Sequence, residues 1–343
     1  MPPELMTNSR RRSLRTCPRK HYYAYEIGLR RIQPDAPLRI GSAAHLGLYL
    51  EGVGGSREDA IVAGTVGMVA DMPYEAEAVG RMLMGYWWRW SEVEEEIVLS
   101  ERAFTLPIEG EDYWLYAGRI DKAVITADGR RVLREHKTTS LGLEPDSSYW
   151  PRLRIDGQAS LYVDGAAVHG FETATVEYDV LHKPALVPGS VPILDADGLK
   201  VVLDASGERV MTKQGKPRQT ASAADGYVLQ TRPETAEEYG ERITADIVAR
   251  PDFYYARHEV VRLEPELEES RREFADAIAE IEWRRGRRCW PRNDQACSGM
   301  GRCPNFDLCS GGADLDIDAA PEGYHFVENV HPELKGEDND CTA

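Results

Sequence analysis

The sequence predicts an α/β fold for this chain of 343 residues. Three consecutive segments, 97–106, 113–125 and 131–137, carry the bulky, partly alternating residues of strands separated by turn signals, which predicts a meander. A helix over 151–167 and a further strand over 173–183 follow. With 42% hydrophobic residues, the chain can bury a substantial core, as one large domain or one domain with insertions.

The other elements follow in chain order from the same patterns. These patterns predict helices at 8–28, 41–50, 57–71 and 74–96, then a helix at 234–249, a strand at 253–263 and a helix at 265–287. Residues 184–232 lack these periodic patterns and are rich in Gly, Pro, Ala and Asp. This composition predicts a partly flexible insertion around a hairpin. The segment 311–343 is acidic and rich in Gly, Ala and Asp, which predicts a poorly ordered tail.

Two short motifs, Gly118-x-x-Asp121 and Glu135-x-Lys137, flank a predicted turn at 127–129. If those three residues form the loop, the numbers of cross-strand partners sum to 256, so Asp121 lies opposite Glu135. Side chains alternate between the faces of a strand, so Lys137 shares the face of Glu135.

Two opposed carboxylates repel each other unless positive charge lies between them. A divalent cation supplies that charge, and oxygen ligands suit magnesium or manganese. The ammonium group of Lys137 can then orient a water molecule or hold a phosphate, which outlines a site for phosphodiester hydrolysis. The alternative interpretation is a surface hairpin with ordinary scattered charges.

Three further polar residues are candidates for the same site. His45 follows small residues that let a backbone approach closely, and its imidazole is a reasonable metal ligand. Gln158 and Tyr162 are four residues apart on a predicted helix and therefore share one face. The alternatives are a packed histidine in the core and a helix that only covers the sheet.

The cysteines form a second pattern. Cys297, Cys303 and Cys309 are spaced C-x5-C-x5-C in a loop after the last helix, without the C-x2-C pairs that are typical of zinc sites. Three thiolates in one loop suit an iron–sulfur cubane, which needs a fourth ligand. The spacing does not decide whether Cys17 or Cys289 is this fourth ligand.

The net charge of −17 is unevenly distributed. Residues 307–343 hold ten acidic residues and one lysine, whereas residues 1–31 hold eight basic residues and two glutamates. A third segment, 281–303, has six arginines and two acidic residues. Because charges more than about 8 Å apart are largely screened at physiological ionic strength, local patches decide contact with phosphates, and the composition permits a DNA partner.

No stretch of the sequence is long and apolar enough to span a membrane, and the arginine-rich N-terminus does not resemble a secretory signal. We therefore expect no membrane partner and a cytoplasmic location. In a reducing cytosol the six cysteines favour metal binding over disulfides.

In this order, His45, Gly118-x-x-Asp121, Glu135-x-Lys137 and Gln158-x-x-x-Tyr162 resemble the RecB/AddB-like branch of the PD-(D/E)XK nucleases. That branch includes the CRISPR-associated adaptation exonucleases and phage-encoded relatives. The stretch around Cys17, from Leu14 to Tyr25, resembles the opening helix of this family. The resemblance covers roughly residues 8–310 and implies a restriction-endonuclease-like core: a mixed central sheet flanked by helices, with helical additions and a Cys-rich C-terminal loop.

The resemblance also implies roles for single residues. Its metal ligands, for Mg or Mn, would be His45, Asp121, Glu135 and the backbone carbonyl of His136. Lys137 would position or activate the water, and Gln158 and Tyr162 would complete the catalytic site. A [4Fe-4S] cluster would be held by Cys17, Cys297, Cys303 and Cys309. The chain departs from the family in the wide spacing of its last three cysteines and in the additional Cys289.

The sequence thus predicts one nuclease domain over 1–310, whose two ends the cluster joins, and a metal-dependent DNA exonuclease acting on single strands or DNA ends. Such an enzyme works in recombination, repair or replication, beside a helicase or recombination protein. Two alternatives remain, a catalytically inactive DNA-binding partner on the same fold and a site-specific endonuclease.

Overall fold

The structure is a computed structural model that describes residues 3–298, 302–311 and 319–334. Its centre is a six-stranded sheet in the order β1-β4-β5-β6-β11, and β3 pairs with β4 along nearly the whole length of β4. These strands are β1 (Glu4–Met6), β3 (Glu95–Ile108), β4 (Glu111–Thr126), β5 (Arg131–Thr139), β6 (Thr175–His182) and β11 (Tyr255–Val261). Because β1–β4 and β5–β6 are parallel and the other pairs antiparallel, the sheet is mixed, as predicted.

The hairpin between β4 and β5 has the predicted register. Its four pairs run from Lys122 with Arg134 to Ile125 with Arg131, so that partner numbers sum to 256. Gly129 has φ +82 and its N–H donates to the carbonyl of Thr126, which closes the loop over three residues. Glycine adopts this left-handed backbone without the strain that other residues meet, which fixes both the turn and the register.

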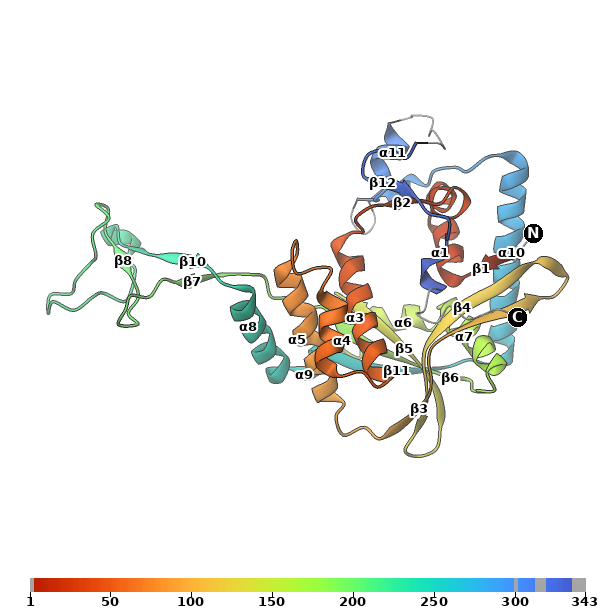
Figure 1. Ribbon diagram of the computed structural model, residues 1–343, viewed down its shortest axis with the longest axis horizontal. Helices are drawn as coiled ribbons and strands as arrows, with labels where there is room; N and C mark the ends of the chain where they lie inside the picture. The colour runs from red at the N-terminus through yellow and green to blue at the C-terminus, as the bar shows by residue number, and fades with distance from the viewer. Residues whose placement is uncertain (1–2, 299–301, 312–318, 335–343) are drawn as a thin grey trace.

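Helices cover both faces of the sheet (Figure 1). On one side lie α3 (Ala36–Gly52), α4 (Arg57–Thr65), α5 (Pro73–Arg89), α8 (Ala236–Ala249) and the short α9 (Pro251–Tyr254). Their buried side chains form one core with residues at one end of the sheet, such as Leu181 and Tyr255. A second core lies against α7 (Gly157–Val168) and α10 (Glu264–Arg287) and includes Phe274 and Ile278.

The connection from β5 to β6 is two helices, where the sequence predicts one. The first is α6 (Tyr149–Leu153) and the second is α7. Asp156 lies between them, and its side chain accepts the N–H of Gln158 at 3.1 Å. An N-terminal cap of this kind fixes where a helix begins, so Asp156 sets the position of Gln158 in the first turn of α7.

The predicted helix over 8–28 is divided into α1 (Asn8–Thr16), α2 (Pro18–His21) and a π-helical turn η1 (Tyr22–Glu26). The break falls at Cys17, whose backbone is extended with φ −163 and ψ 114. Pro18 is the cause, because a proline disfavours helical backbone at the residue before it. The thiol of Cys17 consequently lies at a bend.

Part of the expected acidic tail is ordered, which differs from the prediction for these residues. The strand β12 (Tyr324–Phe326) pairs antiparallel with β2 (Leu29–Arg31), and a 3₁₀ turn η4 (Pro332–Leu334) follows. The hydroxyl of Thr7 donates to Glu333 at 2.6 Å. Backbone pairing and this contact order residues 324–334 despite the acidic composition of the segment. The rest of the predicted tail, residues 312–318 and 335–343, lies outside the described part of the chain.

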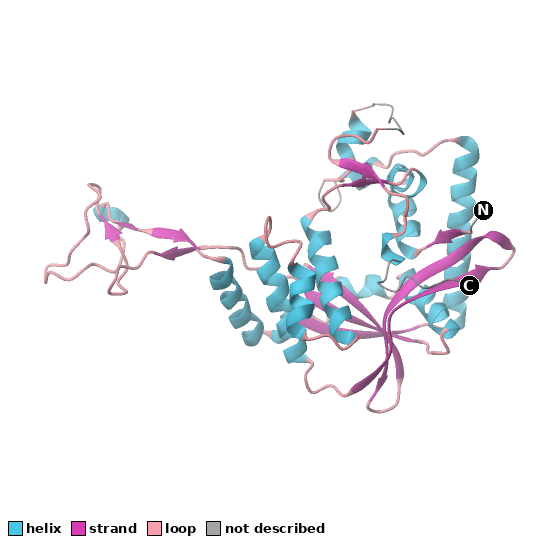
Figure 2. Cartoon of the chain, viewed as in Figure 1, coloured by secondary structure: helices cyan, strands magenta, loops and turns pink. Residues whose placement is uncertain are grey.

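The predicted insertion projects away from the sheet as an extended arm (Figure 2). Its base is β7 (Ser190–Pro192) paired with β10 (Thr231–Pro233), and further out lie β8 (Val202–Leu203), β9 (Val228–Leu229) and the 3₁₀ turn η2 (Ala223–Asp225). Three similar turns follow one another, closed by bridges Leu194–Lys200, Leu203–Arg209 and Met211–Pro217. Each contains a glycine with positive φ, a repeat that sequence inspection did not reveal.

Two short elements follow α10. They are the 3₁₀ turn η3 (Asp294–Cys297) and α11 (Phe306–Ser310). The hydroxyl of Tyr324 in β12 donates to the carbonyl of Pro304 at 2.8 Å, so the ordered part of the acidic segment contacts the Cys-rich loop. In the described residues, no helix is long and apolar enough to cross a membrane.

Candidate active site

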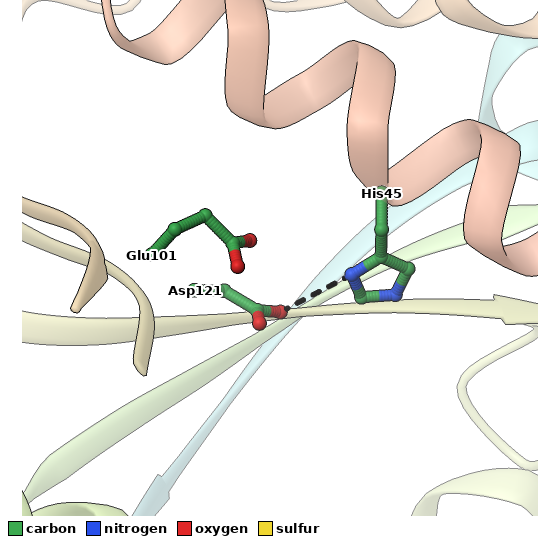
Figure 3. A group of neighbouring side chains, drawn as sticks. All are labelled: His45, Glu101 and Asp121. Carbon is green, nitrogen blue, oxygen red and sulfur yellow. Dashed lines mark ion pairs between the residues drawn. The ribbon is translucent and has the colours of Figure 1, made fainter. Parts of the chain in front are cut away.

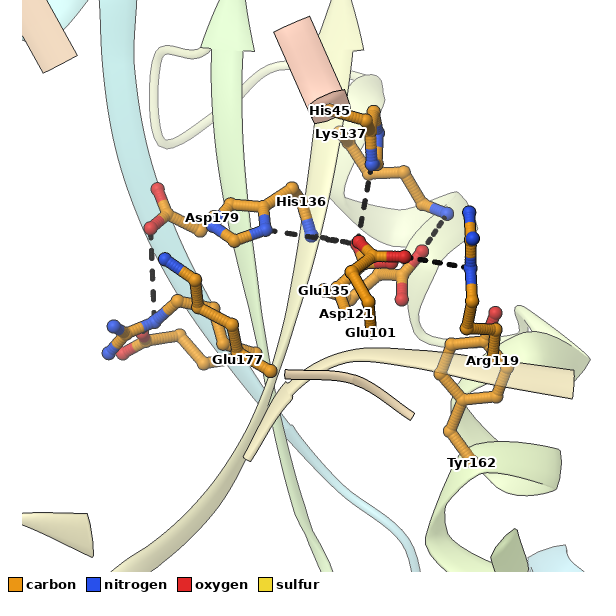
Figure 4. A network of polar contacts seen from close by, with 12 residues as sticks. His45, Glu101, Arg119, Asp121, Glu135, His136, Lys137, Tyr162, Glu177 and Asp179 are labelled. Carbon is orange, nitrogen blue, oxygen red and sulfur yellow. Dashed lines mark hydrogen bonds and ion pairs between the residues drawn. The ribbon is translucent and has the colours of Figure 1, made fainter. Parts of the chain in front are cut away.

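The candidate site lies where β4 and β5 separate. The described ladder ends at Lys122 and Arg134, one pair before the predicted pair of Asp121 and Glu135. At that point the N–H of His136 donates to Oδ2 of Asp121 at 2.9 Å, so a carboxylate continues the hydrogen bonding between the strands. The carboxyl groups of Asp121 and Glu135 lie on one side of the sheet, as the register predicts (Figure 4).

Lys137 is held between Glu135 and Gln158. Its Nζ lies 2.6 Å from Oε1 of Glu135 and 2.6 Å from Oε1 of Gln158. The amide nitrogen of Gln158 donates to Oε1 of Glu135 at 2.7 Å and to the hydroxyl of Tyr162 at 2.9 Å. The structure therefore brings the four predicted residues Glu135, Lys137, Gln158 and Tyr162 into one hydrogen-bonded chain.

Gly118 makes room for this chain. A Cβ atom at this position would lie 2.6 Å from the ring of Phe104 and 3.0 Å from the ring of Tyr162. Real Cβ atoms do not approach a ring as closely as 2.6 Å, so any larger residue would force Phe104 to move and would press on Tyr162. The first residue of the motif Gly118-x-x-Asp121 thus has a packing role.

His45 reaches the site from α3. Its Nδ1 lies 3.7 Å from Oδ2 of Asp121. The helix approaches β5 closely at Gly41, where a Cβ atom would lie 3.3 Å from Oγ1 of Thr138, as expected from the small residues before His45. Burial lowers the pKa of His45 to about 4, so the imidazole is neutral at pH 7 and keeps a lone pair for a metal.

The ring of His136 lies beside Asp121, with Nδ1 3.8 Å from Oδ2 of that carboxylate (Figure 4). Its Nε2 lies 3.4 Å from the hydroxyl of Tyr86, which donates to Asp179 at 2.7 Å. Arg257 also donates to Asp179, at 3.0 Å, within a buried charged network. The ring of His136 therefore lies between the carboxylate of Asp121 and the buried network around Asp179, and its backbone carbonyl as a metal ligand stays a prediction.

Glu101 is a site residue that sequence reasoning missed. It lies in β3 with the unusual φ of +47, and its Oε2 is 2.7 Å from Nε of Arg119. His45, Glu101 and Asp121 each offer an atom within 4.8 Å of the others, a group that could hold a metal ion (Figure 3). A left-handed backbone costs a residue other than glycine about 1–2 kcal/mol, so strong contacts must hold Glu101 in place.

The buried carboxyl groups have high affinity for protons. Burial and the charge of Asp121 raise the pKa of Glu101 to about 8 and the pKa of Glu135 to about 7. Burial also raises the pKa of Asp121 to about 6. Such a group of acids binds positive charge, whether as protons or as a divalent cation.

The cysteines predicted to bind a cluster lie near the bend between α1 and α2, where Cys17 is located. The Sγ of Cys17 accepts the N–H of Asn293 at 3.4 Å, and the Sγ of Cys297 lies 3.6 Å from the carbonyl of the same residue. Burial and the nearby thiols of Cys303, Cys17 and Cys309 raise the pKa of Cys297. Cys289 is exposed and takes no part in these contacts, and Cys341 lies outside the described residues.

The chain belongs to the PD-(D/E)XK nuclease superfamily, whose family model matches residues 6–310. It is therefore a nuclease, and the predicted mixed sheet flanked by helices is confirmed. The match names neither the RecB/AddB-like branch nor a phage origin.

Two solved structures are similar to the chain. One is a "Putative exonuclease" from Eubacterium rectale, with 10% identity, a TM-score of 0.38, and coverage of 91% of this chain and 90% of that one. The other is the protein SSO0001, with 11% identity, a TM-score of 0.25, and coverage of 72% of this chain and 76% of that one. No curated protein matched the chain.

Proposed function

We propose that this nuclease is a Mg- or Mn-dependent exonuclease that degrades DNA from ends or as single strands. The observation that carries the proposal is the approach of Nζ of Lys137 to within 2.6 Å of Glu135, beside the carboxyl group of Asp121. Paired carboxylates can hold a divalent cation for metal-assisted phosphodiester hydrolysis, and an adjacent ammonium can orient the attacking water. The donor set of His45, Asp121 and Glu135 fits such a cation, with the carbonyl of His136 as a further ligand.

The bound cation lowers the pKa of a water molecule and stabilises negative charge on the phosphate. In the protein, burial favours the neutral amine of Lys137, but the carboxylates of Glu135, Asp156 and Asp121 outweigh it and raise its pKa. Lys137 is therefore an ammonium at neutral pH. It orients the water and offsets charge on the phosphate, and does not act as a general base.

Gln158 and Tyr162 position this ammonium. Gln158 accepts from Lys137 and donates to Glu135, so it fixes the spacing between the cation and the carboxylate. Tyr162 accepts the second N–H of the same amide. Since the cap at Asp156 fixes the first turn of α7, the geometry of the site is set by the start of that helix.

We further propose that Cys17, Cys297, Cys303 and Cys309 hold a [4Fe-4S] cluster. Cys17 and Cys297 both contact Asn293, and Cys303 and Cys309 lie near enough to raise the pKa of the Cys297 thiol, which favours Cys17 over the exposed Cys289 as the fourth ligand. The cluster would tie the bend before Pro18 to the C-terminal loop. A structural metal of this kind contributes on the order of 10 kcal/mol, comparable to the stability of a domain.

The biological setting of this activity is part of the proposal. A cluster of reduced thiolates suits a cytoplasmic location. Degradation of DNA ends suits recombination, repair or replication, with a helicase or recombination protein supplying the strand.

One digestion experiment tests the activity. Linear single-stranded, linear double-stranded and circular DNA are incubated with the protein in Mn²⁺, Mg²⁺ or EDTA. The proposal expects mononucleotides or short products from linear DNA in Mn²⁺ or Mg²⁺ and intact circles. Discrete fragments from circular duplex would instead indicate a site-specific endonuclease, and binding without degradation would indicate an inactive DNA-binding protein.

A further inference from the structure

Glu101 belongs to a row of three acidic residues on neighbouring strands. In the β3–β4 ladder, Ser100 pairs with Lys122 and Arg102 pairs with Ile120, which places Glu101 directly across from Asp121. On the other side of Asp121, the register of β4 and β5 places Glu135. Figure 4 shows the carboxyl groups of all three residues gathered at one point.

Two ion pairs lie at the ends of this row, since Glu101 is paired with Arg119 and Glu135 is paired with Lys137. Asp121, the middle residue, lies 3.7 Å from the imidazole Nδ1 of His45. Oε2 of Glu135 is buried and has no hydrogen-bond partner among the described residues. The residue as a whole is only 3% exposed, so solvent does not readily supply one. A buried carboxylate oxygen without a partner is costly and points to a ligand that it would contact.

The backbone of Glu101 supports the same interpretation. A φ of +47 in a strand is unfavourable for glutamate, and its side chain is directed at His45 and Asp121 (Figure 3). Residues in such strained conformations persist where surrounding contacts hold them, and they concentrate at functional sites. The ion pair with Arg119 holds the carboxylate near this position when no cation competes for it.

We propose that Glu101 is a further protein ligand of the divalent cation, beyond the residues of the family motif. The inference rests on the proposed function, because it concerns the same cation. Glu101 exchanges its contact with Arg119 for the cation, and completes an oxygen-rich ligand set with Asp121 and Glu135. Carboxylates of this number favour Mg²⁺ or Mn²⁺ over softer metals.

Titration calorimetry of MnCl₂ into the full-length protein, without DNA, tests this role independently of activity. Glu101→Gln keeps the shape of the side chain but cannot present a carboxylate to the cation, so it should weaken Mn²⁺ binding about tenfold or more. Glu96→Gln, an exposed glutamate on the same strand, is the matched control and should bind as the wild type does. Asp121→Asn should abolish binding.

A second variant protects the test against misfolding. Glu101→Asn also lacks the charge, and asparagine tolerates a left-handed backbone better than most residues. It should unfold at the wild-type temperature in EDTA and still bind Mn²⁺ weakly. Loss of Mn²⁺ binding in Asp121→Asn would show that the calorimetry reports this site. Wild-type affinity for Mn²⁺ in either folded Glu101 variant would then overturn the inference. Absence of Mn²⁺ binding by the wild type itself would instead contradict the proposed function.

Discussion

The backbone N–H of His136 donates a hydrogen bond of 2.9 Å to Oδ2 of Asp121, at the point where β4 and β5 leave each other. A charge-assisted bond of this kind is stronger than a neutral one. It fixes the carboxylate of Asp121 relative to β5, the strand that carries Glu135 and Lys137. The spacing of the proposed metal site is therefore built into the backbone of the sheet.

Replacement of Lys137 tests the role of the ammonium group. Lys137→Met should lower the rate of DNA degradation at least 100-fold, because a charge that faces the reacting phosphate is lost. Calorimetry should show that Mn²⁺ still binds, since Lys137 is not a ligand. The exposed lysine of the arm, Lys213, provides the control variant Lys213→Met, which should keep full activity. Undiminished digestion by Lys137→Met would show that catalysis does not depend on the ammonium group of Lys137.

Tyr162 is predicted to act on the rate through Gln158. Tyr162→Phe removes the acceptor of one N–H of Gln158 and should lower kcat about three- to tenfold, while the free energy of unfolding changes by about 1 kcal/mol. Tyr116→Phe loses a comparable bond to the carbonyl of Arg271 and should change stability alone. Equal kcat values for the two variants would refute the positioning role.

The cysteine variants separate the two candidates for the fourth cluster ligand. Purified protein should be brown, and Cys17→Ser or Cys303→Ser should yield colourless protein of low solubility, because the proposed link between the chain ends is lost. Cys289→Ser should retain the colour, since that thiol is exposed and is not among the thiols that act on the pKa of Cys297. Iron content and visible absorption measure the outcome. A brown Cys17→Ser protein with a colourless Cys289→Ser protein would reverse the assignment.

His21 predicts a pH dependence of stability. Burial and the positive charges of Arg10 and Arg285 lower its pKa to about 3. An unfolded histidine has a pKa near about 6.5, so between these values the unfolded state binds more protons than the folded state. The contribution of His21 is complete above pH 6.5 and is lost as the pH falls toward 3, by up to about 1.4 kcal/mol per pH unit.

The measurement compares melting temperatures of the wild type and His21→Phe between pH 7.5 and pH 5 at about 0.5-unit steps, a range that spans the unfolded pKa. Phenylalanine keeps the stacking of the ring on Trp290, with centroids 5.2 Å apart in the wild type. The wild type should lose stability more steeply than the variant as the pH falls. Parallel curves would show that His21 does not contribute.

The register of the central hairpin could be predicted because one glycine determines it. Gly129 closes a three-residue loop, and no irregularity intervenes between that loop and Lys122. Alternation along regular strands then places Glu135 and Lys137 on one face. The helical spacing of Gln158 and Tyr162 is equally local, which is why both could be assigned to one face from their sequence separation.

The place of Glu101 at the site could not be predicted by counting cross-strand partners along regular strands. From the pair Ile108–Glu111, regular antiparallel pairing would place Glu101 opposite Gly118. The ladder shifts between Pro107 and Ile108, so that Glu101 instead faces Asp121. A shift by three residues also exchanges the faces of the strand. Pro107 lies at the shift and proline is typical of bulges and edge strands, but the size of the shift could not be predicted from it. The break before Pro18 was readable in principle, because proline restricts its predecessor.

Contacts between distant segments also escaped prediction. The ordering of β12 depends on its pairing with β2, almost three hundred residues earlier in the chain. Composition alone describes Tyr324 and its neighbours as part of an acidic segment. The three turns of the arm share a glycine at positive φ. The first two also share the pattern Leu-Asp-Ala-x-Gly, at 194–198 and 203–207, so this repeat was readable in the sequence.

The central claim is that a cation held by Asp121 and Glu135 cleaves the DNA backbone. Its most direct test is digestion of end-labelled linear DNA by wild-type protein and Glu135→Gln, each in Mn²⁺ and in EDTA, with melting curves to verify folding. We predict degradation by the wild type in Mn²⁺ alone, and none by the folded variant under either condition. Degradation in EDTA, or by Glu135→Gln at the wild-type rate, would contradict the account.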